Sequence, residues 1–166
     1  MQPIFIKDFL PSQLLNVCHS YCLIKYSNKK NFTLDSQTSS LVTEHGDYLM
    51  ETIMDLSTPV VEQNVGKKLW PTYSFFRIYD KGSEDEEKDE NSDYKYFDEN
   101  RKLTRLKIDG KFPMKKNNAL IFKGMDKLHW REICEHDNFI TVFLHYVDQE
   151  GDYKEYKYDK RKMLGE

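Results

Sequence analysis

The feature of this sequence that most constrains its fold is an aromatic and β-branched run, LWPTYSFFRIY, which extends from residue 69 to residue 79. Aromatic and β-branched residues favour the extended backbone of a strand. Alternation along a strand places successive side chains on opposite faces. One face is then expected to carry Tyr73, Phe75, Arg77 and Tyr79, and the other Ser74, Phe76 and Ile78. The run predicts a strand with two occupied faces.

Two helices are predicted before this strand. Pro11 suits a first helical position, and apolar residues follow at a spacing of three to four, which predicts a helix from about Pro11 to Tyr26. A second helix is predicted to start at Asp47, whose side chain can cap free N–H groups, and to end at Gly66. Pro59 is expected to kink or divide it. Residues 27–40 are expected to form a loop or an irregular crossing strand.

The rest of the chain is predicted to be mostly β-structure. Residues 84–99 hold nine acidic side chains against Lys88 and Lys95, a local net charge of −7, and are expected to form a solvated, mobile loop. A hairpin is predicted from residues 103–108 and 111–114 around the turn Asp109-Gly110. Further strands are expected at 119–123, 139–147 and 153–158. We therefore expect one α+β domain over residues 1–166, with a helical part at 1–66 and a β-roll at 69–158.

Composition excludes several classes of protein. The chain carries 25 basic and 28 acidic residues, a net charge of −3, which does not suit a dedicated nucleic-acid binder. No apolar run approaches the ~20 residues that span a bilayer, so no membrane partner and a cytoplasmic location are expected. The three cysteines agree with a reducing compartment. Cys18 and Cys22 flank His19 at a spacing that suits either a soft-metal site or an ordinary buried helix face.

The segment ALIFKGMDKLHWRE, residues 119–132, is the strongest candidate for chemistry. A short apolar strand is predicted to end at Gly124, and His129 then stands beside Trp130, Arg131 and Glu132. A neutral imidazole beside a large aromatic wall suits a metal ligand with restricted access to water. The alternative is a surface histidine in a packing cluster around the tryptophan.

Three blocks resemble the iron(II)- and 2-oxoglutarate-dependent dioxygenases, in particular the small prolyl-4-hydroxylase-like proteins of phages, large viruses and bacteria. These are LWPTYSFFRIYDKGSE, ALIFKGMDKLHWRE and TVFLHYVDQEG, in this order after the two helices. The resemblance implies a double-stranded β-helix, a cupin-like jelly roll, with the N-terminal helices packed on one sheet. It also implies Fe(II) held by two histidines and a carboxylate, with open positions for 2-oxoglutarate and dioxygen. His129 corresponds to the second metal histidine, and Tyr79 to the tyrosine that hydrogen-bonds the cosubstrate.

The chain departs from this family in two respects. The family places a His-x-Asp pair shortly after the segment that holds Gly82, but no histidine lies between His45 and His129. His45-Gly46-Asp47 is formally such a pair, although an N-cap role for its aspartate is the simpler interpretation. The family also uses a basic residue for the distal carboxylate of 2-oxoglutarate. Arg131, Arg77 and His145 are the alternatives here, and Arg131 is preferred because a planar guanidinium suits a carboxylate.

The sequence leaves two functions open. The first is a prolyl-hydroxylase-like dioxygenase that uses Fe(II) and 2-oxoglutarate on a peptide or protein substrate. The second is a non-catalytic β-roll that binds a partner without metal, because the missing His-x-Asp makes the metal set incomplete. A segment lost after Gly82 would account for the same departure. The sequence fixes neither the substrate nor the oligomeric state.

Overall fold

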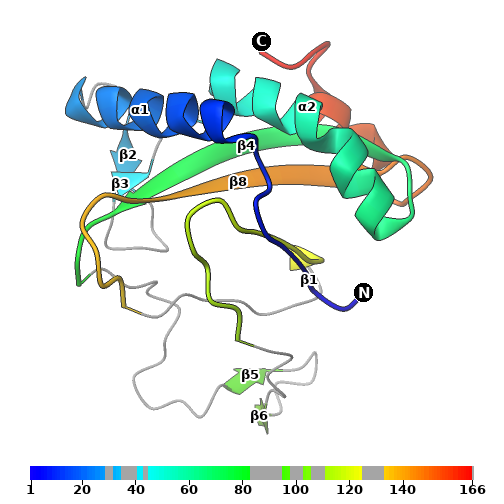
Figure 1. The fold of residues 1–166 in the computed structure, drawn as a ribbon. Helices are drawn as coiled ribbons and strands as arrows, with labels where there is room; N and C mark the ends of the chain where they lie inside the picture. The colour runs from blue at the N-terminus through cyan, green and yellow to red at the C-terminus, as the bar shows by residue number, and fades with distance from the viewer. Residues whose placement is uncertain are drawn as a thin grey trace.

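The computed structural model describes residues 1–28, 32–34, 41–42, 45–82, 95–97, 103–105, 111–124 and 133–165 and shows an α+β fold. Figure 1 labels most of its elements. In chain order they are β1 (Ile4–Ile6), α1 (Ser12–Asn28), β2 (Thr33–Leu34), β3 (Leu41–Val42), α2 (Tyr48–Val65), β4 (Leu69–Tyr79), β5 (Lys95–Phe97), β6 (Leu103–Arg105), β7 (Ala119–Ile121), β8 (Phe139–Asp148) and the 3₁₀ helix η2 (Lys154–Lys160).

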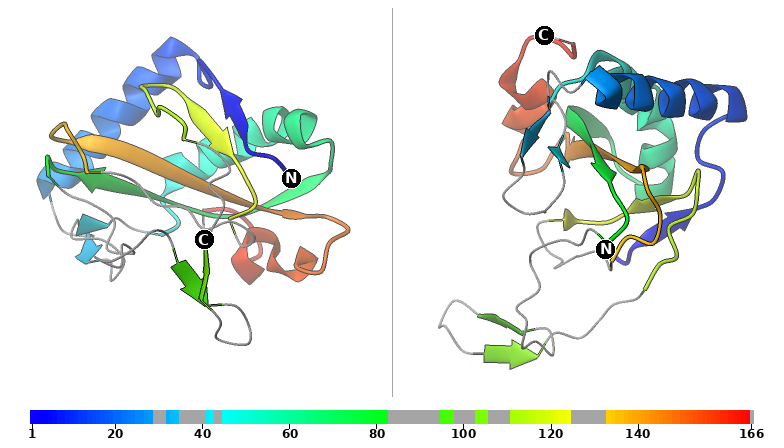
Figure 2. Two further views of the ribbon diagram at one scale, coloured as in Figure 1. Left: turned by 90° about the horizontal axis from the view of Figure 1, so that it is seen from below. Right: turned by 90° about the vertical axis from the view of Figure 1, so that its left-hand side faces the viewer.

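The fold is layered around the long strands β4 and β8. These strands pair with each other in an antiparallel four-stranded sheet of order β2-β3-β4-β8. The helices α1 and α2 lie over one face of this sheet, and the small β1–β7 sheet lies on the opposite side, in both Figure 1 and the right-hand view of Figure 2. The described strands do not close into a barrel. The expected α+β class is confirmed, with the predicted helices on one face of the main sheet.

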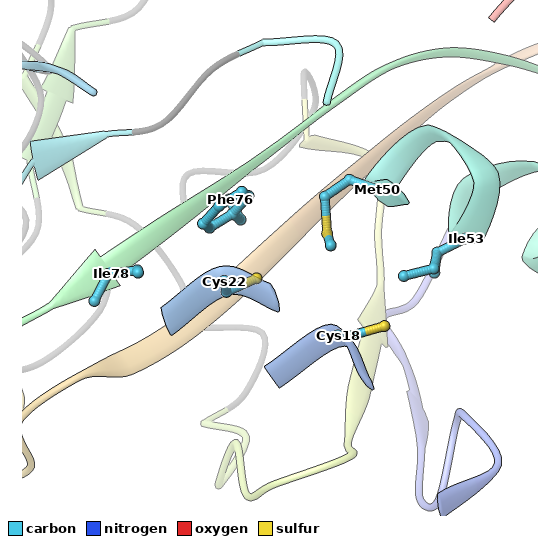
Figure 3. Packing of buried hydrophobic residues seen from close by; sticks show 6 residues of the cluster. All are labelled: Cys18, Cys22, Met50, Ile53, Phe76 and Ile78. Carbon is cyan, nitrogen blue, oxygen red and sulfur yellow. The ribbon is translucent and has the colours of Figure 1, made fainter. Parts of the chain in front are cut away.

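The helix-facing side of β4 forms the hydrophobic core. Phe76 and Ile78 are 0% and 2% exposed, and they pack against Cys18 and Cys22 of α1 and against Met50 of α2. Figure 3 shows these side chains converging between the strand and the two helices. Full burial of a large apolar side chain stabilises a fold by about 1.5–3 kcal/mol. The two cysteines are therefore core residues, and both are free thiols.

The helix α2 begins and ends where the local signals predict. The Asp47 carboxylate accepts hydrogen bonds from the N–H groups of Leu49 and Met50, at 3.0 and 3.1 Å. Gly66 ends the helix in the left-handed conformation, with φ of 70°. The interpretation of Asp47 as an N-cap is thus confirmed. Of the two alternatives for Pro59, it does not divide the helix, because α2 runs through it as a single element.

Two other expectations about local structure were wrong. The β-hairpin does not form as predicted, because β6 pairs with β5 and residues 111–114 are not in a strand. Residues 153–158 are not a strand but belong mostly to η2. Within the acidic segment, Lys95–Phe97 form β5, and residues 84–94 lie outside the described part. Among the described residues, no helix is long and apolar enough to cross a membrane.

Candidate functional site

The face of β4 that points away from the helices carries a cluster of aromatic rings. Phe75 stacks on Phe143 of β8 with ring centroids 4.5 Å apart, and Tyr73 stacks on His145 with centroids 4.2 Å apart. Both pairs are nearly coplanar, at 15°. His45, just before α2, adds a fifth ring whose centroid lies 5.2 Å from that of Phe75. We call these five residues the aromatic face.

A β-bulge in β4 lies beside the aromatic face. Pro71 pairs with Tyr146 and Ser74 with Leu144, so three steps on β4 match two on β8. Proline has no N–H to donate to the ladder, and strands tolerate it at such irregularities. The Thr72 hydroxyl donates a hydrogen bond of 3.0 Å to the carbonyl of His145 inside this region. These contacts hold β4 and β8 together where the Tyr73–His145 stack stands.

Arg77 extends the aromatic face along β4. The carbon at the centre of its guanidinium lies 5.3 Å from the Phe75 ring centroid and 5.1 Å from that of Phe143, a cation–π arrangement. The residue is only 8% exposed. A planar guanidinium in a region shielded from water is well suited to bind a carboxylate through two parallel hydrogen bonds.

Tyr79, the predicted cosubstrate tyrosine, lies on the same face of β4 as Arg77. The two residues are two positions apart on a regular part of the strand, which separates their Cα atoms by about 6.6 Å. Tyr79 is 1% exposed. The structure thus brings together a guanidinium and a phenol, both shielded from solvent, beside the aromatic face.

The other end of the aromatic face meets the C-terminal part of the chain. Burial raises the pKa of the Tyr73 phenol, and the negative charge of Asp159 raises it further. Arg161 reaches the same region, because its Nη2 donates a hydrogen bond of 3.0 Å to the carbonyl of Thr72. Arg77 thus places a cation towards one end of the aromatic face, and the negative charge of Asp159 acts on Tyr73 at the other end.

The predicted site residues fall into two groups. His129 and Arg131 lie outside the described residues, so their roles stay predictions. Tyr79 and both alternatives for the distal carboxylate, Arg77 and His145, belong to one face of the β4–β8 pair by strand alternation and ring contacts. The structure therefore places the alternatives on the aromatic face.

The described residues bear on the metal site only in part, because His129 lies outside them. The described residues contain no group of three His, Cys, Asp or Glu side chains that could hold a metal ion. Burial raises the pKa of the Cys22 thiol to about 12, which disfavours the thiolate that a soft metal needs. Asp47 is engaged by Tyr21 and Lys25, each at 2.6 Å, in addition to its capping role. The described residues alone therefore do not supply the metal-ligand set that the resemblance implies.

The sequence did not predict two features of this site: the contact of His45 with the rings of β4, since His45 was considered only as part of a His-x-Asp pair, and the effect of Asp159. His45 reaches the face from the turn before α2, where Gly46 N–H donates a hydrogen bond of 3.0 Å to the carbonyl of Ser74. The charge of Asp159, in the C-terminal segment, acts on Tyr73. Neither position has a local signal, because both depend on contacts between distant parts of the chain. The position of Phe143 could have been predicted from the sequence, because alternation along FITVFLHYVD places Phe143 and His145 on one face of the strand.

Comparison with known proteins adds no relative. A scan against protein-family models, a search of curated proteins and a search of solved structures each found no match. Function therefore has to be argued from the residues of this chain and their arrangement.

Proposed function

We propose that the chain is a dioxygenase-like β-roll that binds 2-oxoglutarate or a closely similar dicarboxylate on the face of β4 opposite the helices. The finer fold belongs to the same proposal: the four-stranded sheet is the major sheet of a double-stranded β-helix, and β1 and β7 belong to the facing sheet. The layering supports this assignment, because helices cover one side of β4–β8 and the β1–β7 pair lies on the other (Figure 2).

The observation that carries the proposal is the shared position of Arg77 and Tyr79. Both are nearly inaccessible to solvent, at 8% and 1% exposed, and both lie on the face that carries the aromatic rings. Charge-assisted hydrogen bonds from a guanidinium are about twice as strong as neutral ones, and a tyrosine hydroxyl adds a donor to the same ligand. Arg77 is in this proposal the guanidinium for the distal carboxylate, and Arg131 becomes the second choice.

The proposal separates dicarboxylate binding from the binding of iron. His129 is the metal ligand that the sequence predicts. The chain has no His-x-Asp after Gly82, and the described residues form no three-ligand group. Dicarboxylate binding by Arg77 and Tyr79 does not depend on how that site is completed.

Calorimetric titration with 2-oxoglutarate under anaerobic conditions tests the proposal. We expect micromolar-range binding to the wild-type chain, at least tenfold weaker binding to Arg77→Lys, and a smaller loss in Tyr79→Phe. Arg77→Lys keeps the positive charge but loses the planar guanidinium with its two parallel N–H donors. It therefore tests the donor geometry separately from the charge, which a neutral replacement would not do. Lys115→Met, which removes an exposed charge in the loop before β7, is the matched control and should bind normally.

Two results would contradict the proposal. One is the absence of 2-oxoglutarate binding to the folded wild-type chain. The other is unchanged affinity in both Arg77→Lys and Tyr79→Phe, with circular dichroism showing that both variants are folded.

A second candidate is a non-catalytic binding module with the same fold. The lack of a His-x-Asp after Gly82 favours it, because one imidazole does not hold Fe(II) against water. The two candidates differ in their response to iron. An oxygenase should be stabilised by Fe(II), should lose that stabilisation in His129→Ala, and should release succinate; the binding module should do none of these.

A further inference from the structure

The C-terminal segment lies against one end of the aromatic face. The Lys157 ammonium stands 3.6 Å from the centroid of the Trp70 ring, and Arg161 donates to the carbonyl of Thr72. Residues 157–161 therefore run beside the part of β4 that leads into Tyr73. Figure 1 shows the orange-red C-terminal segment packed at the end of β4 and β8 where α2 also ends.

This segment contains a turn that is unusual for residues with side chains. Tyr158, Asp159 and Lys160 have φ values of 51°, 54° and 63°, so three consecutive residues are left-handed. In this conformation the Cβ atom crowds the backbone. The left-handed conformation therefore persists only where contacts with the rest of the chain stabilise it. Arg161 holds it: Nε donates to the carbonyl of Tyr158 at 2.8 Å, and Nη2 pairs with the buried carboxylate of Glu51 at 2.6 Å.

The negative charge of Asp159, in this turn, raises the pKa of the half-buried Tyr73. Asp159 is exposed and forms no hydrogen bond or ion pair within the described part of the chain. The neighbouring cations are engaged elsewhere. Lys157 lies over Trp70, Lys160 lies 4.3 Å from the Tyr156 ring centroid, and Arg161 pairs with Glu51. These cations therefore leave the charge of Asp159 to act on the Tyr73 end of the ring cluster.

We propose that the end of the aromatic face formed by Tyr73, His145 and Asp159 binds the ammonium or guanidinium group of a basic peptide side chain. Aromatic faces and a carboxylate together attract cations. This inference rests on the proposed function and names its substrate class: a peptide that carries lysine or arginine. Four residues of strand separate Tyr73 from Arg77, about 13 Å, so the cationic group and the dicarboxylate occupy separate places.

The charge of the chain supports a cationic partner. The net charge is −3, and residues 84–99 alone carry nine acids against two lysines. A negative field raises the local concentration of cationic ligands and their rate of association.

NMR titration with small probes tests the inference. The probes are the N-acetyl N-methylamides of lysine and arginine, with norleucine as the uncharged analogue of lysine. We expect the ring signals of Tyr73 and His145 to shift with the two cationic probes and not with norleucine. Asp159→Asn should weaken the cationic probes about fivefold, since it removes the charge and keeps the shape. Asparagine also tolerates the left-handed backbone, so the variant should fold.

The matched control is Asp152→Asn, an exposed aspartate of the same C-terminal region, which should leave the binding of the probes unchanged. Equal shifts with norleucine, no shifts with lysine and arginine, or wild-type affinity in Asp159→Asn would each overturn the inference. A parallel titration with 2-oxoglutarate separates the two proposals. Asp159→Asn should bind 2-oxoglutarate normally, whereas Arg77→Lys should lose 2-oxoglutarate and keep the lysine probe.

Discussion

The ion pair between Arg161 and Glu51 gives the sharpest prediction about stability. The Glu51 side chain is 1% exposed in the first turn of α2, and that of Arg161 is 21% exposed. Oε1 of Glu51 accepts a hydrogen bond of 2.6 Å from Arg161, and Oε2 accepts one from the N–H of Gly165. Arg161→Met removes the guanidinium and leaves a buried carboxylate with a single described donor.

The expected loss can be estimated from this geometry. Breaking a buried ion pair by removing one partner costs about 3–5 kcal/mol, because the remaining charge stays desolvated. The Gly165 N–H still serves Glu51, and Arg161 is partly exposed, so we expect the lower end, about 3 kcal/mol. For a domain of this size that corresponds to a fall of about 6–12 °C in the melting temperature.

Urea unfolding followed by circular dichroism measures this loss. The double variant Glu51→Gln/Arg161→Met should be more stable than the sum of the single variants predicts, by at least about 1 kcal/mol, because the pair is coupled. Lys68→Met is the matched control. It breaks the ion pair with Glu62, in which the lysine side chain is 77% exposed, and should leave the unfolding curve nearly unchanged. A loss below about 1 kcal/mol in Arg161→Met, or strictly additive single variants, would refute this reasoning.

Two further predictions follow from local contacts. Asn117→Ala should cost about 1–3 kcal/mol in urea unfolding, because its amide makes hydrogen bonds of 2.9 and 2.8 Å with the backbone of Leu10. Asn138→Ala, also left-handed with φ of 55° but exposed, is its control and should cost less. Burial and the bond to Asp47 raise the pKa of Tyr21 to about 12. The unfolded chain ionises this tyrosine near pH 10, so stability should fall as the pH rises from 10 to 12, and less steeply in Tyr21→Phe.

The helices and the two long strands could be predicted from the sequence because their signals are local. Asp47 and Gly66 define α2 through capping geometry that needs only the residues of the helix ends. The alternation along β4 predicted which side chains share a face, and Phe76 and Ile78 do pack together against the helices. The period of two along the strands and of 3.6 along the helices therefore predicted the main layers of the fold.

The elements that the sequence did not predict depend on distant partners. Ile4–Ile6 has no turn or alternation to identify it, and it becomes β1 only because β7 pairs with it. Asp109-Gly110 is a strong local signal for a hairpin, but β6 pairs with β5 instead. A strand was predicted for the tyrosine-rich residues 153–158, yet Lys157 on Trp70 and Arg161 on Glu51 hold this segment in a different shape.

The two faces of β4 differ in a way that bears on function. The helix-facing side buries Phe76 and Ile78, which is what packing alone requires. The other side buries a guanidinium and a phenol, at Arg77 and Tyr79. Burying a charged group costs free energy unless the charge is compensated, and an aliphatic side chain over the same rings would avoid that cost. Arg77 lies over the rings of Phe75 and Phe143 and two positions from the buried Tyr79. A guanidinium and a phenol on one face can both donate hydrogen bonds to a carboxylate, and this is why we propose the dicarboxylate site on that face.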